Sequence, residues 1–320
     1  MKVTDSTGAP VPGVAVGFNV QGSGVSLSAA SANTDANGNA SVGATAGATP
    51  GTSTVVASVG NLSQSFTLTV KPIGPEFGLN NLLNGASFQV QKQVAPGQIL
   101  TITGTGVSNG AQGVVLPSSE VGPLPTTLNG VQVLFNDTPA PIYNVANVNG
   151  HEQVTVLVPF ELQLGNVSLV INAGGAPSDP LTVPVVASQP GIFETVDANN
   201  NRYAVVLHSN GSYVTPAAPA VRGETLRYFV TSLGQTTPTA VTSNAGVANQ
   251  MVNSTLVVGV ADAGVQIIEA KYVENFVGLY TVDFVVPDSA PSGTQVKLNM
   301  ALVTSDGIAY YSNASSFAIQ

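Results

Sequence analysis

Apolar and polar residues alternate along most of the chain. In residues 14–20 and 65–70, for example, every second side chain is apolar. A period of two places alternate side chains on opposite faces of a β-strand, whereas the helical period of 3.6 is nearly absent. The pattern predicts an all-β protein.

Valine and threonine dominate the alternating segments, and glycine, proline or asparagine interrupts them roughly every 8 to 12 residues. Short strands at that spacing are typical of antiparallel β-sandwiches. A chain of 320 residues is long enough for two or three such domains. We therefore expect tandem antiparallel β-sandwiches.

Two segments rich in proline and glycine divide the chain. Residues 71–75 contain two prolines and a glycine after a clear strand pattern, and residues 188–191 follow another strand with similar chemistry. Proline cannot donate to a sheet ladder, so both segments favour linkers. The predicted domains are residues 1–71, 72–188 and 189–320.

The second and third domains share their spacing. Gly97 and Gly223 each precede a strand, and strands that end in Pro159 and Pro287 follow 62 and 64 residues later. Each proline is followed by a glycine six residues on. Agreement at several landmarks favours an internal duplication.

Several motifs resemble known families. The segments VTDSTGAPVPGV (3–14) and TDANGNA (34–40) resemble the bacterial Ig-like domain that is repeated in invasin and intimin adhesins. The segments NGASF (84–88), APG (95–97) and QPGIF (189–193) resemble an uncharacterised C-terminal region of large secreted acidobacterial proteins. Within it, LTITGTG (100–106) is similar to the first strand of Ig-like IPT/TIG domains.

The resemblance implies Ig-like folds throughout. Residues 1–71 would be a bacterial Ig-like domain, residues 72–188 an IPT/TIG-like domain, and residues 189–320 the second Ig-like domain of the duplicated region. Neither family supplies a catalytic residue to transfer to this sequence.

The composition narrows the choice of partners. Only 8 Lys and Arg stand against 17 Asp and Glu, and charged residues make up 8% of the chain, against roughly 25% in an ordinary domain. A net charge of −9 with three arginines argues against nucleic acid as a main partner. No apolar run approaches the roughly 18 residues of a membrane helix, so we expect no membrane insertion.

The compartment is also indicated by composition. Abundant Ser, Thr, Asn and Gly with 21 prolines is typical of a bacterial secreted or cell-surface protein. Residues 1–5 show no secretion signal, which leaves open a cytoplasmic protein or a mature or excised segment of a longer one. There is no cysteine, which excludes disulfides and thiolate metal sites.

No residue pattern points to catalysis. Residues 106–110 match the Gly-x-Ser-x-Gly nucleophile elbow, but residues 111–117 are not helical in pattern, and a turn is the better interpretation. The two histidines, His151 and His208, fall in different predicted domains beside turn residues, and each reads as a solvated loop histidine. We predict a protein that is not an enzyme and has no catalytic residue or cofactor.

Metal binding and modification stay open. The loops at Asp35 and Asp197 space oxygen ligands as calcium loops do, but neither completes the EF-hand pattern, and tight turns favour the same residues. We predict no metal site, and the sequence does not decide whether these two turns bind calcium. Lys297 is the best-placed lysine for an isopeptide bond. Seven Asn-x-Ser/Thr sequons do not decide whether the chain is glycosylated.

Aromatic and basic residues concentrate near the C-terminus. The chain has no Trp, and seven of its eight tyrosines and all three arginines follow residue 190. A ligand-binding face, if present, is therefore expected in the third domain. The candidates are Arg222, Arg227, Tyr272, Tyr310 and Tyr311, with packing in the core as the alternative.

The sequence favours a non-enzymatic, extracellular structural or adhesive module of a bacterial surface protein. Self-association or contacts with other surface or matrix proteins would serve that role. By resemblance the first domain starts on its second strand, so one edge of its sheet would lack its usual neighbour. Residues 316–320 have a strand pattern, and they either pair with that edge in another copy or pair within their own domain. The alternative is a glycan- or matrix-binding module with its site in the third domain.

Overall fold

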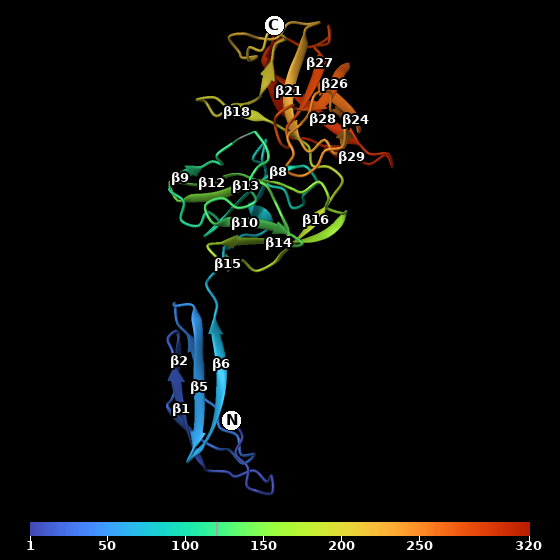
Figure 1. Ribbon diagram of the computed structural model, residues 1–320. Helices are drawn as coiled ribbons and strands as arrows, with labels where there is room; N and C mark the ends of the chain where they lie inside the picture. Colours follow the sequence, from blue (N-terminus) through green and yellow to red (C-terminus); the bar gives the residue numbers. More distant parts are fainter. Residues whose placement is uncertain (120) are drawn as a thin grey trace. The chain divides into compact units, whose positions relative to one another are not determined.

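The described chain consists almost entirely of β-strands. The computed structural model describes residues 1–119 and 121–320 (Figure 1). Its one helical element within these residues is a 3₁₀ turn, η1 (Leu79–Asn81). Named strands pair in antiparallel fashion in every sheet. The predictions of an all-β fold and of antiparallel sandwiches are confirmed. No helix in the described part is long and apolar enough to cross a membrane.

The chain forms two compact units, Met1–Ile73 and Gly74–Gln320. The first unit is a small sandwich with a four-stranded sheet in the order β3-β1-β5-β6 and a two-stranded sheet β2-β4. Its strands are β1 (Ala15–Gln21), β2 (Val25–Leu27), β3 (Ser31–Asn33), β4 (Ala44–Ala46), β5 (Gly51–Val59) and β6 (Leu62–Val70). Its buried core comprises Val16, Phe18, Ala40, Val55 and Ala57.

The second unit contains two sandwiches. The one nearer the N-terminus, here called the second sandwich, has sheets in the orders β7-β8-β13-β12-β9 and β11-β10-β14-β15, with β16 also paired to β14. Its strands are β7 (Leu82–Asn84), β8 (Ile99–Gly104), β9 (Gly113–Val115), β10 (Val131–Phe135), β11 (Thr138–Pro139), β12 (Ile142–Val148), β13 (His151–Leu157), β14 (Gly165–Ala173), β15 (Ala176–Pro177) and β16 (Leu181–Val185).

The third sandwich repeats this plan. Its sheets have the orders β17-β21-β27-β26-β23-β22, with β20 on β21, and β25-β24-β28-β29, with β30 on β28; β18 and β19 form a separate ribbon. Its strands are β17 (Gly191–Ile192), β18 (Glu194–Val196), β19 (Arg202–Ala204), β20 (Val206–Leu207), β21 (Thr225–Thr231), β22 (Thr236–Thr237), β23 (Met251–Val252), β24 (Thr255–Val260), β25 (Ala263–Gly264), β26 (Ile267–Tyr272), β27 (Tyr280–Val285), β28 (Gly293–Val303), β29 (Ala309–Tyr311) and β30 (Ser315–Ile319).

The two larger sandwiches share the order of their central strands, and the third adds β18, β19, β20 and β22. β13 lies between β8 and β12, and β27 lies between β21 and β26, so the strands before Pro159 and Pro287 hold the same place. β12 and β26 each carry a register shift, at Ile142/Asn144 and Ile267/Glu269. The two sandwiches therefore share the strand order that the predicted duplication requires, and the duplication itself stays a prediction.

The opening glycines make the same contacts in both copies. The amide of Gly97 donates to the carbonyl of Val158 at 2.9 Å, and that of Gly223 to Val286 at 2.8 Å. Both glycines have positive φ, 72° and 80°, a conformation that costs other residues energy. Glycine is therefore required at this turn in each copy.

The second and third sandwiches are joined by packing and hydrogen bonds. The ring of Phe160, from the second sandwich, packs edge-on against Tyr272 of the third at 6.2 Å between centroids. The amide of Ile99 donates to Oγ1 of Thr231 at 2.8 Å, and Oγ of Ser188 donates to the carbonyl of Ser232 at 2.6 Å. Ile99, Leu157 and Phe160 belong to the same buried cluster as the core of the third sandwich. The boundary at residue 188/189 stays a prediction, because these cores are continuous.

The C-terminal strand is paired within its own sandwich. β30 pairs with β28 in antiparallel fashion, and the amide of Gln320 donates to the carbonyl of Ala220 at 3.0 Å. Of the two roles expected for residues 316–320, the structure shows pairing within the domain.

Candidate functional site

Two of the predicted ligand residues serve the fold. The guanidinium of Arg222 donates to the carbonyls of Ala290 and Gln320 and to Oγ of Ser292, at 2.8 to 2.9 Å. Tyr272 is 2% exposed and accepts a hydrogen bond from the amide of Gly278. Its burial raises the pKa of the phenol to about 12. Tyr272 therefore has no surface to offer a ligand, and the alternative of core packing describes it.

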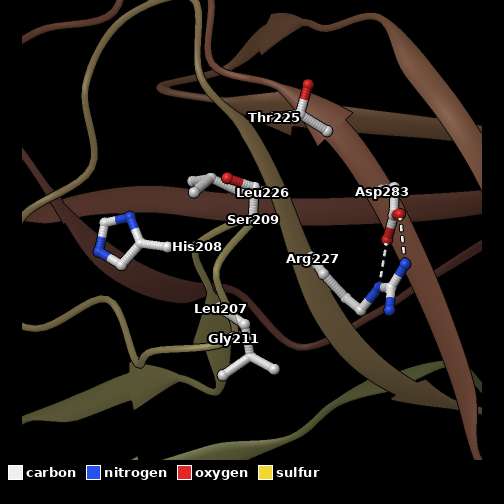
Figure 2. A pocket seen from close by; sticks show the side chains of 8 residues that line it. All are labelled: Leu207, His208, Ser209, Gly211, Thr225, Leu226, Arg227 and Asp283. Atoms are coloured by element: carbon white, nitrogen blue, oxygen red, sulfur yellow. Dashed lines mark hydrogen bonds and ion pairs between the residues drawn. The ribbon is translucent and has the colours of Figure 1, made fainter.

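Arg227 lines a pocket of about 220 Å³ in the third sandwich, shown in Figure 2. Its Nε and Nη2 atoms donate to both carboxylate oxygens of Asp283 at 2.7 Å. Glu269 lies 3.6 Å from Nη2 and also pairs with Lys271. The charges in this cluster compensate one another, so Arg227 is not free to hold an anion.

His208 lines the same pocket and is held on both sides. Its Nδ1 lies 2.6 Å from a carboxylate oxygen of Glu224, and its Nε2 lies 3.2 Å from the carbonyl of Ala218. The side chain is 14% exposed, so the prediction of a solvated loop histidine is wrong. Two acceptors facing the two ring nitrogens favour the doubly protonated ring.

The other two predicted residues lie elsewhere. Tyr310 and Tyr311 are on β29, paired across from Leu302 and Ala301 of β28. Tyr311 is 75% exposed and borders a shallow hollow on the outer face of that sheet. The structure thus distributes the five predicted residues over a loop and three strands and does not assemble them into one site.

The nucleophile-elbow motif is a structural turn. Ser108 is fully buried, and its Oγ donates to a carboxylate oxygen of Glu152 at 2.6 Å. Burial opposes ionisation of Glu152, but bonds from Ser108 and Gly106 outweigh it and lower the pKa. His151 begins β13 and is exposed. A buried serine that is a donor to a carboxylate is not an accessible nucleophile.

The acidic loops also serve turns. One carboxylate oxygen of Asp35 accepts from the amides of Asn37 and Asn39, and Asp197 does the same with Asn199 and Asn201. No group of three or more metal-ligating side chains occurs within the described residues. Lys297 pairs with exposed Asp262 at 2.6 Å rather than lying in a buried environment.

A different site appears on the second sandwich, at the positions that match the Arg227 cluster. Cross-strand pairing sets Thr101 opposite Thr155 and Asn144 opposite Thr155, as it sets Arg227 and Glu269 opposite Asp283. The two copies therefore present the same sheet face with different chemistry. In the third sandwich it carries compensated charges, and in the second it carries neutral hydroxyl and amide groups.

Aromatic side chains surround this neutral face. Together they enclose a groove of about 290 Å³ at the junction of the second and third sandwiches. We call it the aromatic groove; its floor is made by Thr101, Asn144, Gln153 and Thr155, and its walls by Phe88, Tyr143, Phe193 and Phe276 with Gly85, Ile99, Val277 and Leu279. Phe88 is 53% exposed and Phe276 47%. No charged residue lines the groove.

The backbone at Phe88 is unusual. Its φ of 56° lies in the left-handed region, which is an outlier for a bulky residue. The amide of Phe88 donates to the carbonyl of Asn84 at 2.8 Å, which closes the turn that holds it. Such strain concentrates at functional positions, and here it presents an exposed ring to the groove.

Asn144 brings an unused acceptor to the floor. It lies at the β12 bulge, and its Oδ1 is buried without a hydrogen-bond partner in the described structure. Asn172 Oδ1, Glu194 Oε1 and Ser315 Oγ share that state elsewhere. An unpaired buried polar atom costs about 1–3 kcal/mol, which a donor from a ligand would recover.

Two sequence motifs create the groove wall. Segment 84–88 ends in Phe88 and segment 189–193 ends in Phe193, and both line the groove. They meet where Nδ2 of Asn84 donates to the carbonyl of Gln189 at 3.2 Å. A Cβ at Gly191 would lie 2.0 Å from Oδ1 of Asn84, so glycine is required there. The motifs were visible in the sequence, but their contact was not.

A family model matches the start of the chain. Residues 1–71 match the bacterial Ig-like domain (group 1), which agrees with the resemblance predicted for the first domain. The match covers 71 of the 320 residues. The resemblance of residues 84–320 to the acidobacterial region stays a prediction. Comparison with curated proteins gave no match.

Similar solved structures include surface proteins. Invasin, described as a bacterial integrin-binding protein, is 17% identical over 99% of this chain and 55% of its own, with a TM-score of 0.23. The Bacteroides ovatus protein SGBP-B, solved with a mixed-linkage heptasaccharide, is 12% identical over 96% of this chain and 60% of its own, at 0.29. PbSGBP-B from Prevotella bryantii is 12% identical over 75% and 42%, at 0.24.

The chain spans about half the length of these proteins. At TM-scores below 0.5, the likenesses support no inference about a ligand or partner of this chain. An inference about a ligand therefore has to rest on the geometry of this chain.

Proposed function

We propose that the chain is a non-enzymatic, extracellular binding module of a bacterial surface protein, and that its aromatic groove binds a neutral oligosaccharide. We assign it three Ig-like domains, at residues 1–71, 72–188 and 189–320. The carrying observation is the combination, in one groove, of exposed aromatic rings with uncharged hydrogen-bonding groups.

The groove chemistry suits a sugar. A pyranose ring has C–H faces that pack on aromatic rings, and hydroxyls that exchange hydrogen bonds with amides and hydroxyls. Phe88 and Phe276 offer ring surface, while Asn144 and Gln153 offer amides. Asn144 Oδ1, which is buried and has no hydrogen-bond partner within the described residues, is the acceptor that we assign to a sugar hydroxyl.

The charge of the groove favours a neutral ligand. An anionic sugar would find no cation among the lining residues, and the chain as a whole carries a net charge of −9. Uronic acids and sulfated glycans are therefore expected to bind more weakly than neutral glycans of the same length.

Immobilised neutral and acidic glycans test this proposal with the full chain. We expect retention on one or more neutral glycans, and Phe276→Ala should weaken it about fivefold or more, because a packed ring contributes about 1 kcal/mol or more. Tyr213→Ala is the matched control, since Tyr213 is 64% exposed and lies outside the groove. Binding of no neutral glycan, or equal weakening by both variants, would overturn the proposal.

Self-association is a second candidate function, favoured by the edge of the first sandwich. β6 is a nine-residue edge strand whose ring Phe66 is 41% exposed, next to an apolar recess of about 240 Å³ that Phe66 also lines. Long exposed edges pair with strands of other chains. Light scattering should show association that residues 74–320 and Phe66→Lys both lack. A monomer at every concentration would refute it.

A further inference from the structure

The outer face of the β24–β28–β29 sheet has a hollow of about 170 Å³. Its lining is drawn from four neighbouring elements: Val257 and Gly259 of β24, Asp262 and Gly264 of the following hairpin, Asn299, Met300 and Ala301 of β28, and Tyr311 of β29. Tyr311 stands beside the hollow with 75% of its surface exposed. Gly259 pairs with Gly264 on one side and with Asn299 on the other.

Gly259 leaves room for an amide. A Cβ at this position would lie 2.4 Å from Oδ1 of Asn299, so the amide of Asn299 lies directly over the glycine. The φ of Gly259 is not in the left-handed region, so its backbone accepts any residue. Glycine weakens a strand, and here its effect is to leave the place of a Cβ to the amide of Asn299.

The second sandwich carries other residues on the same face. The copies align through a shared contact: Ser178 exchanges two hydrogen bonds with the backbone of Ile171, as Ser312 does with Met300. Val133 pairs with Ile171 and Val258 with Met300, which fixes the register.

Three hollow positions differ between the copies. The residue after Val133 is Leu134 in the second sandwich, and the residue after Val258 is Gly259 in the third. Their partners in the adjoining hairpin are Pro139 and Gly264, respectively. The residues across from Asn172 and Ala301 are Pro177 and Tyr311. Where the second sandwich has a leucine and two prolines, the third has two glycines and an exposed tyrosine.

These differences act together. Removing two side chains opens the sheet face, and adding a tyrosine gives the opening an aromatic wall. The polar groups at its rim are the amide of Asn299 and the carboxylate of Asp262, which is neutralised by Lys297 at 2.6 Å. An aromatic wall with an amide and a compensated carboxylate matches a sugar ring and its hydroxyls.

We infer that this hollow is a second saccharide subsite, in which one pyranose ring packs against Tyr311 and bonds to the amide of Asn299 that lies over Gly259. The inference rests on the proposed function of the aromatic groove, because both take the same neutral glycan class. The hollow lies on the β24–β28–β29 sheet, and the groove lies on the β8–β13–β12 face, so the two sites are separable by mutation.

The test maps both sites at once by amide chemical shifts of the full chain. The probes are cellotetraose, mannotetraose, xylotetraose and maltotetraose, each at about 10 mM to reveal millimolar affinity. At least one should shift the amides of Gly259, Asn299 and Tyr311 as well as those of the groove. Its affinity for the hollow should fall at least about threefold in Tyr311→Ala, as expected for one lost aromatic contact.

Gly259→Leu is the sharper variant, because it installs the residue that the second sandwich has at this place. It should displace the amide of Asn299 and fill the hollow, which abolishes the shifts around the hollow and leaves those of the groove. Tyr213→Ala again serves as the control.

The outcomes separate the two sites. Shifts at the groove alone would overturn the second subsite and leave the proposed function standing. Shifts at the hollow alone would support the subsite and refute the groove. Shifts at neither with any probe would overturn both, and hollow shifts that persist in Gly259→Leu would refute the assignment of this surface.

Discussion

Replacing Phe160 with alanine should destabilise the second and third sandwiches together. Phe160 is 6% exposed, and its ring packs against Tyr272 on one side. On the other side it fills the space beside Gly97, where a Cβ would lie 2.2 Å from the ring. The ring therefore contacts the opening turn of one sandwich and the core of the other.

The size of the effect follows from this burial. Deleting a buried phenylalanine ring costs about 3–5 kcal/mol, which already includes the loss of an edge-on aromatic pair of about 0.5–1.5 kcal/mol. For a unit of this length, each kcal/mol lowers the melting temperature by about 2–4 °C. We expect the melting temperature of the second unit to fall by about 6–20 °C.

Calorimetry of residues 74–320 provides the assay. A single transition that moves as a whole in Phe160→Ala would show that the two sandwiches unfold as one unit. Leu164→Ala is the matched control, because that side chain is 65% exposed and should change stability by about 0.5 kcal/mol or less. Two separate transitions, of which only one moves, would refute the reasoning.

Three further predictions follow from single contacts. Phe88→Gly should be about 1 kcal/mol more stable than Phe88→Ala in urea denaturation, because φ of 56° favours glycine, and equal stability would contradict the strain. For His208, burial opposes the charged ring, but the hydrogen bonds to Glu224 and Ala218 outweigh burial and raise the pKa. The stabilisation from the charged ring is therefore complete below about pH 6.5 and is lost as pH rises through the higher pKa of the folded state. Melting temperatures from pH 6 to 9 should fall less in His208→Gln than in the native chain. Arg227→Met should cost about 1–2 kcal/mol by leaving Asp283 unpaired, while Arg227→Met with Asp283→Asn should cost less, as a double-mutant cycle in urea would show.

Much of the fold was predictable because local patterns carry it. The alternation in residues 14–20 and 65–70 gave the strands β1 and β6, and the spacing of Gly97 and Gly223 gave the strand order that the two sandwiches share. These features depend on neighbours along the chain or on a turn that only glycine accepts.

The binding sites depend on contacts that the sequence does not order. Phe88, Phe193 and Phe276 are each about 80 to 110 residues from the next, and only the packed joint between two sandwiches brings them together. Tyr272 and Tyr311 were equivalent candidates by residue type. The face of the strand that each occupies buries Tyr272 and exposes Tyr311.

The central claim is that the aromatic groove accepts the hydroxyl of a neutral glycan at Asn144. The most direct measurement is the nitrogen-proton spectrum of the side-chain amides while the full chain is saturated with the best-binding neutral glycan. Asn172 is the internal control, because its Oδ1 is also buried and unpaired but does not line the groove. The side-chain amide of Asn144 should shift while that of Asn172 stays in place; an unmoved Asn144 signal at saturation would contradict the claim.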